Sequence, residues 1–110
     1  MQGYSTTEPT RAEIDATGGP LLLEFGSNGC GICSHTQPLL AAALEEHESL
    51  PHIRVEDGRG RPLGRSFRVT LWPTLVFMMD GKEVTRLVRP DSTTRIREAL
   101  ALLDGTNNAP

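Results

Sequence analysis

The chain has 110 residues, of which 37% are hydrophobic and 23% charged, a composition that fits one compact globular domain rather than two. Eleven basic and fourteen acidic residues give a formal net charge of −3 at pH 7, which argues against a general polyanion binder. No apolar run approaches the roughly 20 residues of a membrane span. The opening residues lack the basic and hydrophobic regions of a signal peptide. We therefore expect a cytoplasmic protein, or a mature chain from which a signal peptide has been trimmed, with neither a nucleic-acid nor a membrane partner.

The first two elements are a helix and a strand. A capping-box pattern, Thr10 with Glu13, opens a short helix over about 10–17, before a pair of glycines. An apolar run over 21–25 follows, and only Glu24 interrupts it. Short, continuous apolar runs of this kind are typical of a strand that is covered on both faces.

The remaining elements continue this alternation. We expect a helix over 31–48, strands over 52–55, 74–79 and 83–88, a short helix over 63–67, and a last helix that begins near 90 and keeps helical apolar spacing to 103. Asp80-Gly81 predicts a hairpin between the last two strands. The tail over 104–110 is expected to fray. This order predicts an α/β fold, a mixed sheet with helices on both faces, in one domain with its core over about 21–103.

The chain's only two cysteines stand together in the sequence Cys30-Gly31-Ile32-Cys33. The predicted strand, loop and helix around them place Cys30 in the first turn of a helix, where unpaired N–H groups and the helix dipole favour a thiolate. Cys33 lies one turn deeper, where it can attack a mixed disulfide and release the substrate. The alternative is a pair of inert buried thiols.

These motifs together resemble the thioredoxin family. The strand Leu22–Phe25 resembles the one before the family's active site, and Cys30-Gly31-Ile32-Cys33 resembles its redox motif. Pro38 matches the proline that kinks the active-site helix, and Trp72-Pro73-Thr74 resembles the loop with a cis proline. The match covers about 21–103. It implies the thioredoxin fold, with a central mixed sheet of four to five strands.

The resemblance also implies a function, thiol–disulfide exchange that reduces protein disulfides. Cys30 would be the nucleophile and Cys33 the resolving thiol, with no cofactor or metal beyond their own redox-active disulfide. The expected partners are protein disulfide substrates and a recycling reductase or glutathione. The protein itself is expected to be a monomer. A cis Pro73 would turn its loop so that backbone pairs with an extended substrate, whereas Trp72 either contacts the substrate or covers the thiols. The residues expected to bind substrate are Gly31, Ile32, Trp72 and Pro73.

Glu24 matches the family's buried acid, which assists deprotonation of the second cysteine, here Cys33. Burial of a carboxylate is expected to raise the pKa of Glu24 toward the range useful for proton transfer. Glu24→Gln should then slow release of the mixed disulfide and stabilise the fold, because it removes a buried charge. Two alternatives stay open: Glu24 reaches solvent, or Arg54, where the family often has lysine, pairs with Glu24 and opposes the shift.

Three positions on the rim that docks partners depart from the family pattern, and recycling by an ordinary thioredoxin reductase therefore stays open. Gly29 replaces a tryptophan, Ile32 replaces a proline, and Arg89-Pro90 stands where a glycine is expected. Unlike proline, Ile32 has an N–H that can point at the Cys30 sulfur and stabilise its thiolate. The protein is therefore expected to be a weaker reductant than a typical thioredoxin.

Other functions fit the sequence less well. The pair of cysteines with His47 and His52 has the spacing of a zinc site, but Pro51 prevents one helix from carrying both histidines. Arginines 59, 61, 65 and 68 form a basic cluster that we interpret as a solvated surface, because two acidic residues lie beside it. An interaction module or assembly chaperone with this fold and little turnover remains the alternative function.

Overall fold

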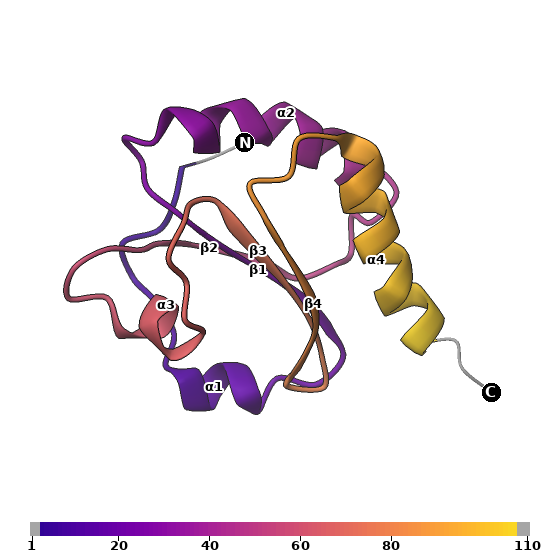
Figure 1. The fold of residues 1–110 in the computed structure, drawn as a ribbon. Helices are drawn as coiled ribbons and strands as arrows, with labels where there is room; N and C mark the ends of the chain where they lie inside the picture. Colours follow the sequence, from indigo (N-terminus) through magenta and orange to yellow (C-terminus); the bar gives the residue numbers. More distant parts are fainter. Residues whose placement is uncertain (1–2, 108–110) are drawn as a thin grey trace.

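Residues 3–107 are described in the computed structural model, and they form a sheet with helices on both of its faces (Figure 1). In chain order the elements are α1 (Arg11–Asp15), β1 (Pro20–Gly26), α2 (Gly31–Leu44), β2 (His52–Glu56), α3 (Pro62–Ser66), β3 (Thr74–Met79), β4 (Lys82–Val88) and α4 (Thr93–Asn107). None of the helices within 3–107 has the length and apolar composition needed to cross a membrane.

The sheet formed by these residues has four strands in the order β2-β1-β3-β4. β1 runs parallel to β2 and antiparallel to β3, and β3 runs antiparallel to β4. Phe25, near the end of β1, pairs with Thr74, at the start of β3. The loop that carries Cys30 and the loop that carries Pro73 therefore lie at the same end of the sheet. This arrangement confirms the predicted fold class.

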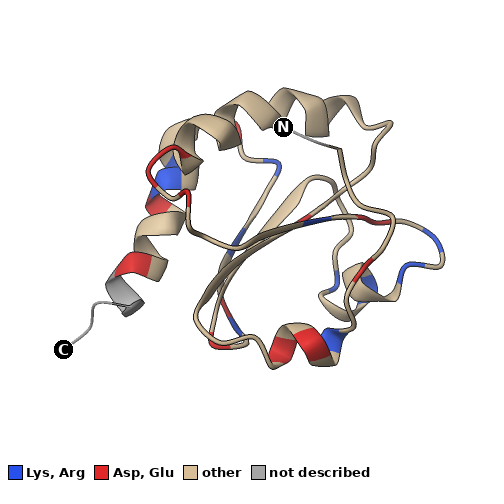
Figure 2. Ribbon diagram, turned by 180° about the vertical axis from the view of Figure 1, so that it is seen from behind, with Lys and Arg blue, Asp and Glu red and all other residues tan. Residues whose placement is uncertain are grey.

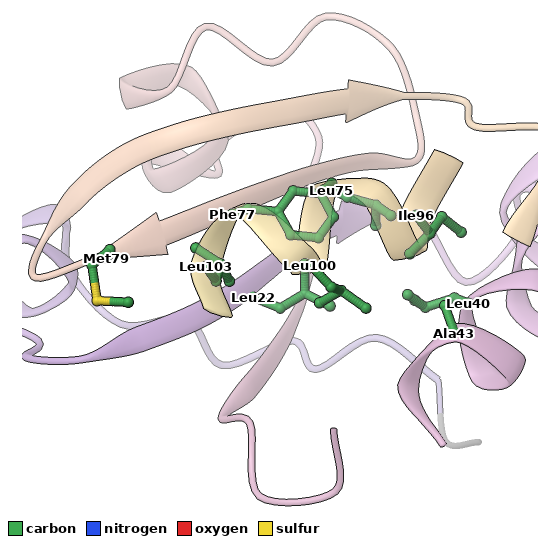
Figure 3. Close-up of a cluster of buried hydrophobic side chains, with 10 residues drawn as sticks. Leu22, Leu40, Ala43, Leu75, Phe77, Met79, Ile96, Leu100 and Leu103 are labelled. Atoms are coloured by element: carbon green, nitrogen blue, oxygen red, sulfur yellow. The ribbon is translucent and has the colours of Figure 1, made fainter. Parts of the chain in front are cut away.

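Each face of the sheet has its own hydrophobic core, because alternate residues of β1 point to opposite faces. One core lies between the sheet and the pair α2 and α4 (Figure 3), and its buried members are Leu22, Leu40, Ala43, Leu75, Phe77, Met79, Ile96, Ala99, Leu100 and Leu103. The other lies toward α1 and α3, and its buried members are Ile14, Leu21, Leu23, Phe25, Val55, Leu63, Phe67, Val76 and Met78. By this alternation Glu24 shares the face of Leu22, which α2 covers.

The predicted elements are all present, with differences at their ends. The capping box of α1 forms as expected, with Thr10 and Glu13 exchanging hydrogen bonds. α2 ends at Leu44 instead of 48, and the chain then makes turns stabilised by local hydrogen bonds such as His47 N to Leu44 O at 2.9 Å. The expectation of a frayed tail from 104 is wrong for 104–107, because α4 continues for one turn beyond Leu103. The rest of the tail, 108–110, lies outside the described residues.

The N-terminal segment adds a contact that the sequence patterns did not predict. Ser5 forms an isolated parallel bridge with Val55 of β2. Its N–H donates to Arg54 O and its carbonyl accepts from Glu56 N, both at 2.9 Å. The segment before α1 is thereby fixed along the outer edge of the sheet, beside β2.

The hairpin between β3 and β4 depends on a glycine. Asp80 and Gly81 both have positive φ, 52° and 78°, as a type I′ turn requires. A Cβ at residue 81 would also overlap the carbonyl group of Asp15, at the end of α1. Gly81 therefore allows both the turn and the close contact between this hairpin and α1.

Gly81→Ala is expected to lower the free energy of unfolding by about 2–4 kcal/mol, since the alanine would be strained in the left-handed region and would displace α1. Gly18→Ala is the matched control, because Gly18 has no positive φ and open space around it. Its stability should change by less than about 0.5 kcal/mol or rise slightly. Urea denaturation measures the free energy of unfolding of both variants. Equal destabilisation by the two substitutions would show that the hairpin does not depend on Gly81.

Candidate active site

Cys30 and Cys33 lie together at the start of α2, where the backbone of one contacts the sulfur of the other. Cys30 is the N-cap residue of α2, and its Sγ accepts a hydrogen bond from Cys33 N at 3.1 Å. Cys30 is half-buried, whereas Cys33 is only 2% exposed, and both thiols are free. One sulfur is therefore accessible to a partner, and the second lies beside it within the protein.

The hydrogen bond to the Cys30 sulfur comes from a different residue than the sequence predicted. Ile32 N–H was expected to make it, but the donor is Cys33 N–H. An N-cap side chain bonds the N–H two or three positions into the helix, and Cys33 is the third residue of α2. Because a proline at residue 32 would leave this donor in place, Ile32 gives no reason to expect a weaker reductant. The Ile32 side chain is 43% exposed at the surface.

Glu24 lies on β1 below the dithiol, completely buried, and four side chains hydrogen-bond its carboxylate. Oε1 contacts His52 Nε2 at 2.8 Å and accepts from Arg54 Nε at 3.0 Å. Oε2 accepts from the Tyr4 hydroxyl at 2.6 Å and from Gln37 Nε2 at 3.0 Å. Glu24 does not reach solvent, and the alternative in which it pairs with Arg54 is the one observed.

The expectation that burial raises the pKa of Glu24 is wrong in its net direction. Burial does raise it, but the hydrogen bonds from His52, Arg54, Tyr4 and Gln37 outweigh burial and lower the pKa of Glu24 to about 2. The carboxylate is therefore charged throughout the neutral range. A group with so low a pKa is a poor acceptor for the Cys33 proton, and the physical argument for Glu24 as the proton-transfer group no longer holds.

Tyr4 and Gln37 belong to this site, although the sequence analysis did not identify them. Gln37 lies one helical turn after Cys33, and its Nε2 donates to Cys33 O at 3.2 Å as well as to Glu24. The i, i+4 spacing from Cys33 was a signal that could have identified Gln37. No such signal exists for Tyr4, since its position depends on the bridge between the N-terminal segment and β2.

The thiol of Cys33 is held in its protonated form by its surroundings. Burial raises the pKa of Cys33 most, and the neighbouring Cys30 raises it further. Hydrogen bonds from the Ser27 backbone and the Tyr4 side chain act in the opposite direction but do not overcome these effects. Since the thiolate is the nucleophile, the resolving reaction needs a group that stabilises the Cys33 anion.

The loop before β3 lies at the same end of the sheet as the dithiol. The peptide bond between Trp72 and Pro73 is cis. Trp72 is tied to the loop after β2 by a hydrogen bond from its Nε1 to Asp57 Oδ2 at 2.9 Å. Arg89 has a φ of 51°, the region that favours glycine, and its Nε donates to Trp72 O at 2.8 Å. Here an arginine adopts the backbone conformation for which a glycine was expected, and its side chain holds the loop.

Two of the competing sites can be compared with the structure. Among the described residues, no group of three or more His, Cys, Asp or Glu side chains is placed to hold a metal ion. His52 contacts Glu24 instead, and His47 lies 4.0 Å from Asp104. The arginine cluster lies before, on and just after α3 (Figure 2), and within it Arg61 pairs with Glu56 at 3.8 Å.

The buried Glu24–Arg54 pair leads to a prediction about stability. Glu24→Gln should lower the free energy of unfolding at pH 7 by about 3 kcal/mol, because Arg54, whose side chain is 11% exposed, loses its charged partner. This reverses the stabilisation expected from the sequence. The matched control is Glu83→Gln, which breaks the half-exposed pair with Arg86 and should cost at most about 1 kcal/mol.

The same pair predicts a dependence on pH. Because folding lowers the pKa of Glu24 from its ordinary value of 4.5 to about 2, its charge stabilises the fold above pH 4.5 and this stabilisation is lost as the pH falls toward 2. Urea midpoints recorded from pH 7 to pH 3 should show wild type losing stability faster than Glu24→Gln. A constant gap between the two proteins would contradict the lowered pKa.

Comparison with known proteins finds thioredoxins. The chain is 50% identical to thioredoxin 2 from Pseudomonas aeruginosa PAO1 in its reduced form, with a TM-score of 0.85 and coverage of 96% of this chain and 97% of that one. Thioredoxin from Chlamydia trachomatis is 36% identical over 74 residues, which are 64% of this chain and 69% of that protein. The TPR repeat-containing thioredoxin TDX from Arabidopsis thaliana is 30% identical over 71 residues, but the match spans only 19% of its length.

The Thioredoxin family model matches residues 4–101. That range includes the dithiol, the buried carboxylate with its four partners, and the loop around the cis proline. Thioredoxins work without a cofactor, since the two cysteines themselves carry the electrons. On this evidence the chain belongs to the thioredoxin family of thiol–disulfide oxidoreductases.

Proposed function

We propose that this protein reduces disulfide bonds in other proteins, with Cys30 as the nucleophile and Cys33 as the resolving thiol. The observation that carries the proposal is the different position of the two sulfurs. Cys30 is a partly exposed residue at the helix start whose Sγ accepts the Cys33 N–H, whereas Cys33 is buried. A partner can reach Cys30 first, and only a group already inside the protein can reach Cys33.

The exchange then takes place in two steps. The Cys30 thiolate attacks one sulfur of the substrate disulfide, forming a mixed disulfide and releasing the other substrate sulfur as a thiolate. Cys33 attacks the Cys30 sulfur, the Cys30–Cys33 disulfide forms, and the second substrate sulfur leaves as a thiolate that takes a proton from water. The substrate is reduced by two electrons, and the protein is oxidised by the same two.

Substrates are proposed to bind over Gly31, Ile32 and the Trp72–Pro73 loop. Ile32 is an exposed apolar side chain between the cysteines, and Leu71, just before the loop, is 45% exposed. The pairing of Phe25 with Thr74 brings both surfaces to one end of the sheet. An extended substrate that pairs with the Trp72 backbone would replace the Arg89 contact with Trp72 O.

After each turnover the Cys30–Cys33 disulfide needs two electrons to return to the dithiol. We propose a recycling reductase or glutathione as their source, and a monomeric protein that works in the cytoplasm. A reducing compartment is consistent with a chain whose only cysteines are this redox pair. Within this proposal Glu24 remains charged and orients Tyr4, Gln37 and Arg54, rather than accepting the Cys33 proton.

Reduction of insulin disulfides by the reduced protein tests the proposed function. A catalytic reductase should accelerate insulin reduction by dithiothreitol, and both Cys30→Ser and Cys33→Ser should abolish the acceleration. Ser34→Ala is the matched control, because Ser34 is the exposed neighbour of Cys33 and should keep the full rate. A wild-type protein with no dithiol-dependent rate would favour the interaction module instead.

Trapping of intermediates tests the roles of the two cysteines. Cys33→Ser should accumulate a mixed disulfide with a substrate protein, since nothing attacks the Cys30 sulfur. Cys30→Ser should accumulate none, because the remaining Cys33 thiol is buried. Non-reducing electrophoresis after incubation with an oxidised substrate measures both, and equal trapping by the two variants would show that the roles are assigned wrongly.

A further inference from the structure

The side chain of Tyr4 is built into the space below Cys33. Its backbone is fixed by Asn28, with Tyr4 N donating to Asn28 Oδ1 at 2.8 Å and Asn28 Nδ2 donating to Tyr4 O at 3.1 Å. The ring packs on Gly26, where a Cβ would overlap both the ring and its hydroxyl. The Arg54 guanidinium lies 4.5 Å from the ring centroid on another side. These contacts therefore fix the position of the Tyr4 hydroxyl in the site.

That place is between the buried carboxylate and the resolving thiol. The Tyr4 hydroxyl lies 2.6 Å from Glu24 Oε2. Burial raises the pKa of Cys33, and the nearby Tyr4 side chain acts against that rise. Tyr4 and Cys33 line one cavity of about 170 Å³, together with Gln37 and Arg54. A cavity of this size has room for several waters. The Tyr4 side chain therefore binds the anionic centre of the network and lines the same cavity as Cys33, whose sulfur reacts.

A phenol has a single proton to donate. Burial and the charge of Glu24 raise the pKa of Tyr4 above its usual range, so the hydroxyl keeps that proton and is never the base. While Cys33 is a thiol, the proton is donated to Glu24. When Cys33 becomes a thiolate, Glu24 still has its contacts with His52, Arg54 and Gln37, and the phenol proton is free to turn to the sulfur.

We propose that Tyr4 assists the resolving step of the proposed reaction by turning its hydroxyl from Glu24 to the Cys33 sulfur as that sulfur becomes a thiolate. The Cys33 proton passes to water in the cavity, and Tyr4 neither gains nor loses one. The stabilised thiolate attacks Cys30, the Cys30–Cys33 bond forms, and the bond from Cys30 to the substrate breaks with its electron pair on the substrate sulfur. The inference rests on the proposed function but concerns only its second step.

Tyr4→Phe tests this inference, because phenylalanine keeps the ring on Gly26 and Arg54 and removes only the hydroxyl. Resolution of a preformed mixed disulfide should be about tenfold slower at pH 7, since a hydrogen bond to a charged group is lost. Its rate profile should shift by about one pH unit to the alkaline side, and the rates should converge at high pH. In a Cys33→Ser background, formation of the mixed disulfide should be unchanged by Tyr4→Phe.

Other titratable and charged groups that face Cys33 and Tyr4 also influence the pH dependence of the resolution rate. These are Cys30 on α2, Glu24 on β1, and His52 and Arg54 on β2. Because wild type and Tyr4→Phe share all of them, the difference between their profiles reports the hydroxyl. Gln37→Met is the control, since it removes another donor to Glu24 Oε2 and a long one, at 3.4 Å, to the Tyr4 hydroxyl, but none to the Cys33 sulfur. A Gln37→Met shift as large as that of Tyr4→Phe, or equal slowing of both steps by Tyr4→Phe, would overturn the proposal.

A spectroscopic titration tests the contact without turnover. Tyr4 is the chain's only tyrosine, so ¹³Cζ-tyrosine labelling gives one NMR signal from this side chain. In the reduced wild-type protein this signal should shift as Cys33 ionises, and in Cys33→Ser that transition should disappear. If the tyrosine signal does not shift when Cys33 ionises, the present proposal is overturned, even if the protein reduces insulin. Loss of insulin reduction with the transition intact would count against the proposed function alone.

Discussion

The site is organised around one buried negative charge, the carboxylate of Glu24. An ionised group without solvent costs several kcal/mol unless it is paired and hydrogen-bonded. Its partners come from three separate parts of the chain: Tyr4 from the N-terminal segment, Gln37 from α2, and His52 and Arg54 from β2. All three parts must therefore be in place together in the folded state. They meet at Glu24, on the strand that precedes the dithiol.

This arrangement gives the two sulfurs different surroundings although they are three residues apart. Cys30 lies at the helix start, where the Cys33 N–H points at its sulfur and the helix dipole favours negative charge. The Cys33 side chain is directed inward, toward the cavity that Tyr4 and Arg54 line. A pair of identical side chains is thereby divided into an accessible attacking group and a protected second group, without any difference in their covalent chemistry.

Local patterns in the sequence predicted most of the fold, because the capping box at Thr10, the Asp80-Gly81 turn and the helical spacing up to Leu103 are each determined by near neighbours. The same holds for the dithiol, whose spacing and position after a strand are local features. The net pKa shift of Glu24 was predicted wrongly because it depends on four partners far away in the sequence. One of them, Tyr4, is held at the site by the bridge between Ser5 and β2 and by the side chain of Asn28.

The close contact between Gly26 and Tyr4 has a consequence for the evolution of the chain. The two positions are far apart in sequence, yet the tyrosine ring occupies the volume that any side chain at residue 26 would need. A change at either position alters the space available to the other, so we expect the two positions to vary together. Relatives that keep a tyrosine at the first position should keep glycine at the second, and those with a larger residue at the second must cover their buried acid by some other side chain.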